Sequence, residues 1–127
     1  MREIFLVGIG GFSGSVLRYK IGSYFLQTFP GTRFPWATFT VNILGCFLVG
    51  IIAASLERLD FHNSELRLLL ITGFLGGFTT FSAFGLETIS LYRGNNFDLA
   101  AINAIGSVAL GLLAVGLGLA VMNRFAS

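Results

Sequence analysis

The chain has 127 residues, of which 54% are hydrophobic and 11% charged, with a mean hydropathy of +0.82. A soluble domain carries roughly a quarter of its residues as charges, so this composition indicates a membrane protein. The formal net charge of +2 comes from a few arginines and lysines and predicts no nucleic-acid surface. No metal-ligand cluster, nucleotide-binding loop or nucleophile triad occurs in the sequence, and we therefore expect no enzyme.

Charged residues divide the chain into apolar stretches that match membrane crossings. Uncharged runs of 23, 19 and 25 residues occupy 34–56, 68–86 and 99–123. About 20 residues, rising about 1.5 Å each, span the hydrocarbon core of a bilayer. A fourth apolar stretch opens the chain. We predict one transmembrane domain of four helices, at about 4–28, 35–56, 65–92 and 99–123.

The first predicted helix carries a basic residue inside an apolar run. Arg18 lies about 21 Å along this helix from Ile4, so it either snorkels to the membrane surface or faces a water-filled vestibule. Gly10 and Gly14 form a GxxxG motif, which allows another helix to approach closely. The N-terminus lacks an A-x-A cleavage site, and we expect it to be retained as a helix.

The second predicted helix places an amide near mid-membrane. Thr38, Asn42 and Gly45 share one face of this helix. A polar group that is buried without a partner costs about 2–7 kcal/mol. We therefore expect Asn42 either to bond another helix or to line a polar pathway. His62, in the short connection that follows, is expected to be solvated.

The third predicted helix contains "GFLGGFTTFSAF" (73–84), where glycines and hydroxyl residues interrupt an apolar run. Glycine costs a helix about 1 kcal/mol relative to alanine, and lipid does not satisfy an exposed backbone break. The hydroxyls of Thr79, Thr80 and Ser82 lie in this stretch. Glu87 follows, as an interfacial cap or a functional acid.

The fourth predicted helix carries small residues that step by four and three positions, at Ala100, Ala104, Ser107, Gly111, Ala114 and Gly118. Such a face favours close helix packing. Asn103 and Ser107 lie one turn apart on the same helix. Each polar residue within a span is compatible with a simple interhelical hydrogen bond, but together they indicate a polar track. A track without a carboxylate at the centre of a span suits a small anion.

Basic residues are distributed almost evenly between the two ends of the predicted bundle. One end carries Arg2, Arg58, Arg67 and Arg124, and the other carries Arg33 and Arg93, with Arg18 and Lys20 nearby. This bias is weak by the positive-inside rule. It permits insertion in both orientations and an antiparallel homodimer, while a parallel dimer with one orientation is the alternative.

Three stretches together resemble the Fluc (CrcB) fluoride channels: "GGFSGSVLRY" (10–19), "ATFTVNILGCF" (37–47) and "TGFLGGFTTFSAFGLE" (72–87). The resemblance implies an all-α membrane protein with four transmembrane helices, the third broken near 76–79. It also implies an antiparallel dual-topology homodimer in a bacterial inner membrane, with two fluoride pores built from both subunits.

The resemblance also implies roles for particular residues. Asn42, Phe81 and Phe84 match the family's pore residues, and the positive edge of an aromatic ring can contact an anion. Backbone carbonyls of Gly76 and Thr79 match those that hold a structural Na⁺ on the dimer axis. Further pore positions are Thr80, Ser82, Asn103 and Ser107, and the vestibule or accessory positions are Arg18, Thr38 and Glu87. The chain departs from the family pattern at Ala83, Gly85 and Asn103.

The expected function is passive export of cytoplasmic fluoride, which confers fluoride resistance. The alternative is a small dual-topology proton-coupled drug antiporter, which needs a glutamate within the first helix. Here that helix has only Glu3, at its start. A membrane scaffold without transport would leave the polar groups inside the spans unexplained.

Overall fold

The computed structural model describes residues 1–58 and 64–125, and His62 lies outside the described residues. Four helical stretches are long and apolar enough to cross a membrane, at Arg2–Thr28, Trp36–Arg58, Glu65–Arg93 and Phe97–Arg124. Three of them are the continuous helices α1 (Arg2–Thr28), α2 (Trp36–Arg58) and α6 (Phe97–Arg124). The third crossing is divided into α3 (Ser64–Arg67), η1 (Leu68–Leu75), α4 (Gly76–Phe78) and α5 (Phe81–Arg93).

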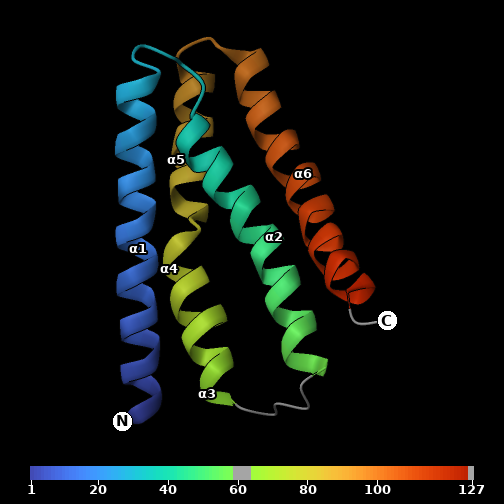
Figure 1. Cartoon of the computed structure of the whole chain (residues 1–127). Coiled ribbons are helices and arrows are strands. Elements are labelled where there is room, and N and C mark those ends of the chain that lie inside the picture. The colour runs from blue at the N-terminus through green and yellow to red at the C-terminus, as the bar shows by residue number, and fades with distance from the viewer. Residues whose placement is uncertain (59–63, 126–127) are drawn as a thin grey trace.

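The crossings alternate in direction, as expected for four consecutive spans. The N-terminus, the end of α2, the start of α3 and the end of α6 lie at one end of the molecule (Figure 1). There Arg2 forms an ion pair with Glu65, at 2.9 Å. At the opposite end, Arg33 donates a 3.0 Å hydrogen bond to the Asn96 side chain, which joins the α1–α2 and α5–α6 connections.

The α1 seam is the contact between α1 and the first half of the third span. It brings Gly10 and Gly14 of α1 against the backbone around Gly73 and Gly77. A Cβ atom on Gly14 would overlap the Phe74 carbonyl oxygen, so only glycine fits there. The GxxxG motif is thus used within the chain, as a close contact between two helices.

The first half of the third span also departs from regular α-helix. Residues Leu68–Leu75 form a π-helix, which no pattern in the sequence predicts. Such segments are rare and often occur at functional sites. The widened turns bring the Leu69 carbonyl and Gly73 directly under Gly10.

The α6 seam is the contact between α2 and α6. Its closest point joins Gly50 and Gly118, where a Cβ atom on either residue would overlap backbone of the other helix. The small-residue face predicted for the fourth helix therefore packs inside the chain. Four of its members are buried: Ala100, Gly111, Ala114 and Gly118.

The break in the third span lies at Thr79 and Thr80. Thr79 has φ −84° and ψ 160°, and Thr80 has φ −151° and ψ 114°, both extended. Gly76 has φ −61° and ψ −36°, an ordinary helical conformation. The break therefore begins later than the 76–79 expected, and Gly76 is not needed for an unusual backbone angle.

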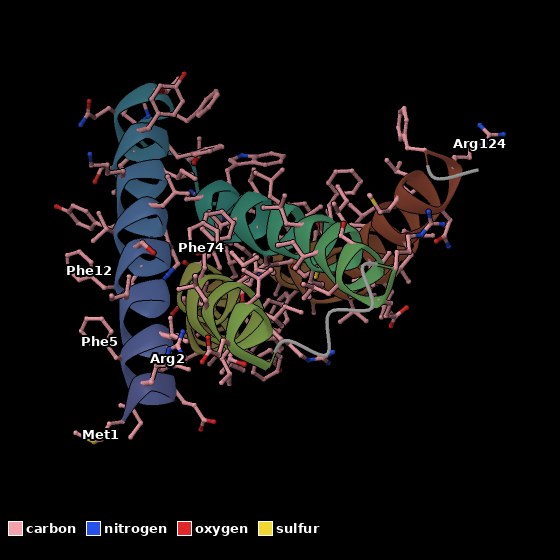
Figure 2. All side chains as sticks on the ribbon, turned by 60° about the horizontal axis from the view of Figure 1, so that its bottom comes forward. Met1, Arg2, Phe5, Phe12, Phe74 and Arg124 are labelled. Carbon is pink, nitrogen blue, oxygen red and sulfur yellow. The ribbon has the colours of Figure 1, made fainter. Side chains whose placement is uncertain are left out.

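A small apolar core lies beside the break. Val41, Leu75 and Phe78 are buried together, and the ring of Phe74 stacks on that of Phe78 with centroids 5.9 Å apart. On the far side of α1, Phe5 and Phe12 point away from the other helices (Figure 2). Both are largely exposed in the chain, as lipid-facing side chains are.

Candidate functional site

Asn42 spans the break from the side of α2. Its Nδ2 donates to the Thr80 carbonyl at 3.0 Å, and its Oδ1 accepts from the Thr80 N–H at 2.8 Å. Both polar groups of one extended residue are therefore satisfied by a single amide, and this pairing fixes which amide atom is nitrogen. The predicted mid-membrane amide thus bonds another helix, at the position where that helix is interrupted.

On the other side of the break, side chains of α1 donate hydrogen bonds to a backbone carbonyl of the third span. The Gly77 carbonyl accepts from Arg18 Nε at 3.1 Å and from Ser15 Oγ at 3.3 Å. A helix end leaves its last carbonyls without partners, and a cationic side chain there also complements the helix dipole. Arg18 therefore caps the first half of the third span, and the same side chain lines a cavity.

The second half of the third span, α5, begins with a side-chain cap and two aromatic rings. Thr80 Oγ1 accepts from the Ala83 N–H at 3.2 Å and lies 3.3 Å from Ser82 Oγ. The rings of Phe81 and Phe84 lie next to each other, with centroids 5.4 Å apart. Phe81 is 83% exposed, at the level of the break.

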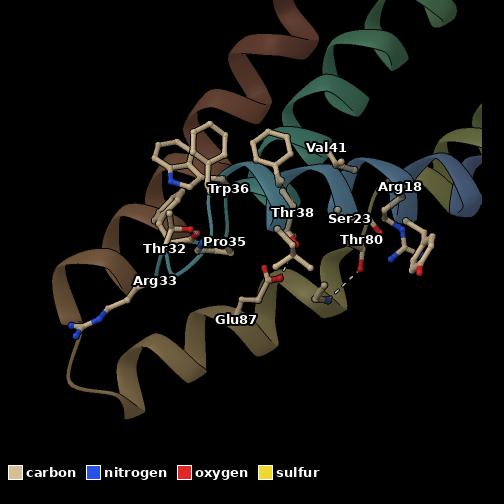
Figure 3. Close-up of a pocket in the computed structure, with 18 of the residues that line it drawn as sticks. Arg18, Ser23, Thr32, Arg33, Pro35, Trp36, Thr38, Val41, Thr80 and Glu87 are labelled. Carbon is tan, nitrogen blue, oxygen red and sulfur yellow. Dashed lines mark hydrogen bonds between the residues drawn. The ribbon is translucent and has the colours of Figure 1, made fainter.

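A cavity of about 570 Å³ opens between the second half of α1, the start of α2 and α5. Arg18, Thr80 and Glu87 line it together with Thr38 (Figure 3). Thr38 donates a 2.7 Å hydrogen bond to Glu87 Oε1, whereas the buried Glu87 Oε2 has no partner among the described residues. The structure thus brings the three predicted vestibule residues, Arg18, Thr38 and Glu87, around one cavity.

The polar residues of α6 form a separate group. Asn103 is only 1% exposed, and its Nδ2 donates to Thr88 Oγ1 of α5 at 2.8 Å. Thr88 in turn donates to the Phe84 carbonyl at 2.7 Å. Ser107 Oγ is buried and has no hydrogen-bonding partner within the described part of the chain. No hydrogen bond between described residues joins Asn103 to Asn42.

Two of these partners were not singled out from the sequence. Ser15 precedes Arg18 by three residues, so both reach the same face of α1, and this spacing was the available signal. Thr88 sits in a regular helix, where a threonine usually bonds its own backbone. Its contact with Asn103 depends on how α5 and α6 pack.

Two backbone carbonyls at the break, those of Gly76 and Thr79, lose the N–H partners that a continuous helix would give them. In a continuous helix, the Gly76 and Thr79 carbonyls would accept from the N–H groups of Thr80 and Ala83. Here Asn42 Oδ1 takes the Thr80 N–H, and Thr80 Oγ1 takes the Ala83 N–H. Gly76 is also exposed on the surface of the chain. The donor set is neutral oxygen, which fits a hard monovalent cation.

The fold and the site define a class: a multi-pass membrane protein with an interrupted helix, whose break is held by polar side chains of neighbouring helices. Residues 5–119 match the family model described as "CrcB-like protein, Camphor Resistance (CrcB)", and the chain belongs to this family.

Curated relatives cover almost the whole chain. A fluoride-specific ion channel FluC of Rhizobium etli (strain CIAT 652) is 50% identical over 126 residues, which cover 99% of this chain and 100% of the relative. The protein of the same name from Methylobacillus flagellatus is 42% identical, covering 93% of this chain and 92% of the relative. That of Agrobacterium fabrum is 42% identical, with coverage of 94% and 95%.

Proposed function

We propose that this chain is a passive, fluoride-selective ion channel that exports fluoride from the cytoplasm. The observation that carries this proposal is its full-length similarity, at 50% identity, to a protein named as a fluoride-specific ion channel. Membership of the CrcB family favours this function over the drug antiporter. The bacterial inner membrane is the location that fits four apolar spans and bacterial relatives.

The chemistry of the site supports a small anion. Phe81 and Phe84 present two adjacent rings, whose edges carry partial positive charge. The buried hydroxyl of Ser107 has no partner in the described chain and is able to donate to an anion. We propose that Asn42, Thr80, Ser82 and Asn103 belong to the same pathway, and that the cavity lined by Arg18, Thr38 and Glu87 is its vestibule.

We further propose that two copies assemble as an antiparallel homodimer, with each pore built from both. One chain leaves Gly76, Phe81 and Ser82 exposed at the level of the break. Lipid would leave the polar groups at that level unsatisfied, so a second protein surface is the better cover. The near balance of basic residues at the two ends is compatible with insertion in both orientations.

A sodium ion on the dimer axis is part of the same proposal. The Gly76 and Thr79 carbonyls lack their helical N–H partners, because two side chains take those N–H groups. Two carbonyls from each of two subunits would supply about four neutral oxygen ligands, which suits a monovalent cation over Ca²⁺ or Mg²⁺. The ion would supply the positive charge that these carbonyls need at membrane depth.

Ion efflux from liposomes tests the central claim. Vesicles that contain the purified protein and are loaded with potassium fluoride should release fluoride when valinomycin is added. Matched vesicles loaded with potassium chloride should release almost nothing. Equal release of both anions would contradict selectivity, and release of neither would contradict the channel itself. Fluoride release that required a proton gradient would instead favour coupled transport.

Cysteine labelling tests the dual orientation separately. The experiment needs one exposed position for a new cysteine near an end of the bundle. Asn95, in the connection between α5 and α6, is unsuitable, because its φ of 59° is one that few residue types adopt. Gln27, which is exposed near the end of α1, is a better position. In a Cys46→Ala background, a Gln27→Cys protein in sealed cells should react with an impermeant thiol reagent in about half of its molecules. Labelling of nearly all or nearly none would support the parallel dimer.

A further inference from the structure

The Gly77 carbonyl lies between the two carbonyls proposed to bind sodium and has partners of its own. It accepts from Ser15 Oγ and from Arg18 Nε, both on α1. Adjacent peptide groups of a helix are joined through one Cα atom and keep a fixed rotation of about 100° about the axis, so holding one carbonyl restricts the next. Hydrogen bonds that hold the Gly77 carbonyl therefore also limit how the peptide group of its neighbour, the exposed Gly76, can turn.

The backbone at Gly77 is also held by packing. A Cβ atom on Gly77 would overlap the Gly11 carbonyl oxygen of α1, so the two backbones are in direct contact. Beyond Gly77, Asn42 fixes both polar groups of Thr80. The four residues from Gly77 to Thr80 are thus clamped from α1 on one side and from α2 on the other.

We propose that Ser15 and Arg18 are positioning residues for the cation site: they orient the last turn before the break, so that the Gly76 and Thr79 carbonyls are preorganised for the ion. This inference rests on the proposed sodium site. Preorganised ligands need no ordering on binding, so a lower sodium concentration suffices. Because Arg18 also lines the cavity, one side chain joins the proposed vestibule to the turn that carries the proposed cation ligands.

The sign of the effect separates positioning from simple electrostatics. If Arg18 acted near the site only as a positive charge, its removal would relieve repulsion and tighten sodium binding. If Arg18 positions the carbonyls, its removal weakens sodium binding. Ser15 carries no charge, so its removal changes sodium binding only through the lost hydrogen bond.

The test measures sodium-dependent thermal stability of the full-length protein in detergent micelles. Sodium chloride is titrated against N-methyl-glucamine chloride at constant ionic strength, and the sodium concentration at half-maximal stabilisation is recorded. Arg18→Gln should raise this concentration about tenfold, and Ser15→Ala about threefold, as expected for losing a charged and a neutral hydrogen bond. Arg18→Lys, which can still donate to the carbonyl, should lie between wild type and Arg18→Gln.

Two matched variants control for charge and for hydroxyl loss. Arg33 lines the same cavity but donates to Asn96, far from the break, so Arg33→Gln should leave the sodium midpoint unchanged. Ser13 lies on the same helix as Ser15 but donates to carbonyls of its own helix, so Ser13→Ala should also have no effect.

The outcomes separate this inference from the proposals on which it rests. Midpoints of Arg18→Gln and Ser15→Ala that equal wild type, or a lowered midpoint for Arg18→Gln, would overturn the positioning role while leaving the sodium site intact. A wild-type protein that sodium does not stabilise would overturn both. Shifted midpoints in a protein that fails to release fluoride from liposomes would retain the positioning role and remove only the channel.

Discussion

The α1 seam and the α6 seam both bring two helix backbones into direct contact, but their partner helices differ. In both, glycines remove side chains so that two backbones touch, at Gly77 on Gly11 in one and at Gly50 on Gly118 in the other. At the α6 seam both helices are continuous, so their backbone hydrogen bonds are made internally and the contact can be apolar. At the α1 seam the partner helix stops at Phe78, and α1 must also supply hydrogen bonds.

That difference teaches how a membrane protein can keep a break in a helix. A lipid-exposed break would leave several backbone groups without partners. Here Arg18 donates a hydrogen bond to the Gly77 carbonyl before the break, and Asn42 bonds both backbone polar groups of Thr80. Close packing and polar side chains therefore occur together at the break in the α1 seam, whereas the hydrogen bonds from Arg58 to Asn123 lie at the exposed end of the α6 seam.

The largest expected effect comes from filling either seam. Gly77→Ala and Gly118→Ala each place a methyl group against rigid backbone, and each should lower the free energy of unfolding by about 3 kcal/mol. Unfolding in mixed micelles measures this loss. The two variants should differ in function, because only Gly77→Ala disturbs the break. In the folded fraction, Gly118→Ala should keep its fluoride flux and Gly77→Ala should lose it.

Gly116→Ala is the matched control for Gly118→Ala. Gly116 lies on the same helix, and nothing stands within 4 Å of an added Cβ atom. Alanine favours a helix over glycine by about 1 kcal/mol, so this variant should be as stable as wild type or slightly more so. A loss of about 3 kcal/mol in Gly116→Ala would show that the close contacts are not the cause.

The second effect in size concerns the amide that spans the break. Asn42→Asp replaces a donor by an acceptor that faces the Thr80 carbonyl, and it would either repel that carbonyl or bury a charge. Fluoride efflux from liposomes should fall by about thirtyfold. Asn42→Asp with wild-type flux would contradict both the cap and the proposed pore role.

A third, smaller effect is expected from the rings that begin α5. Phe81→Ile and Phe84→Ile keep apolar bulk but remove the ring edge, and each should reduce fluoride efflux by about tenfold while cross-linked dimer remains. Phe12→Ile is the control, because Phe12 points away from the other helices of the chain and is largely exposed (Figure 2). Full flux in both α5 variants would rule out an aromatic contact with the anion.

The smallest effect on the chain should come from the glycine next to the α1 seam. Gly76 is helical and exposed, and the nearest atom to an added Cβ would be the Ile71 carbonyl oxygen at 3.8 Å. Gly76→Ala should change the free energy of unfolding by less than about 1 kcal/mol. Loss of cross-linked dimer in a stable Gly76→Ala chain would support a subunit interface at this residue. A large loss in the free energy of unfolding of Gly76→Ala would contradict the finding that an added Cβ atom meets no close neighbour at this position.

Several site residues could be identified from the sequence because lipid makes polar groups conspicuous. Asn42, Thr80 and Asn103 stood out as polar residues within apolar spans. The side chains of Asn42 and Asn103 make interhelical hydrogen bonds, whereas Thr80 bonds Asn42 through its backbone. Ser15 and Thr88 did not stand out, since a hydroxyl in a membrane helix commonly bonds the carbonyl one turn before it, as Ser13 does here. Which hydroxyl reaches another helix depends on packing.

The sequence by itself determined the number of crossings, their alternation and the region in which the third one weakens. These follow from local properties: the length of apolar runs, the position of charges, and the helix cost of glycine. They need no knowledge of which helix lies next to which.

Only the tertiary structure decided where the break falls and what holds it. Asn42 is 38 residues from Thr80, and Arg18 is 59 residues from Gly77, so neither pair is visible as a local pattern. The break lies at Thr79 and Thr80, where the Asn42 amide takes the Thr80 N–H that would otherwise have bonded the Gly76 carbonyl and continued the helix past Phe78. Here the helix ends where a side chain of a neighbouring helix replaces an intrahelical hydrogen bond, and this side chain is in reach only once the helices have packed.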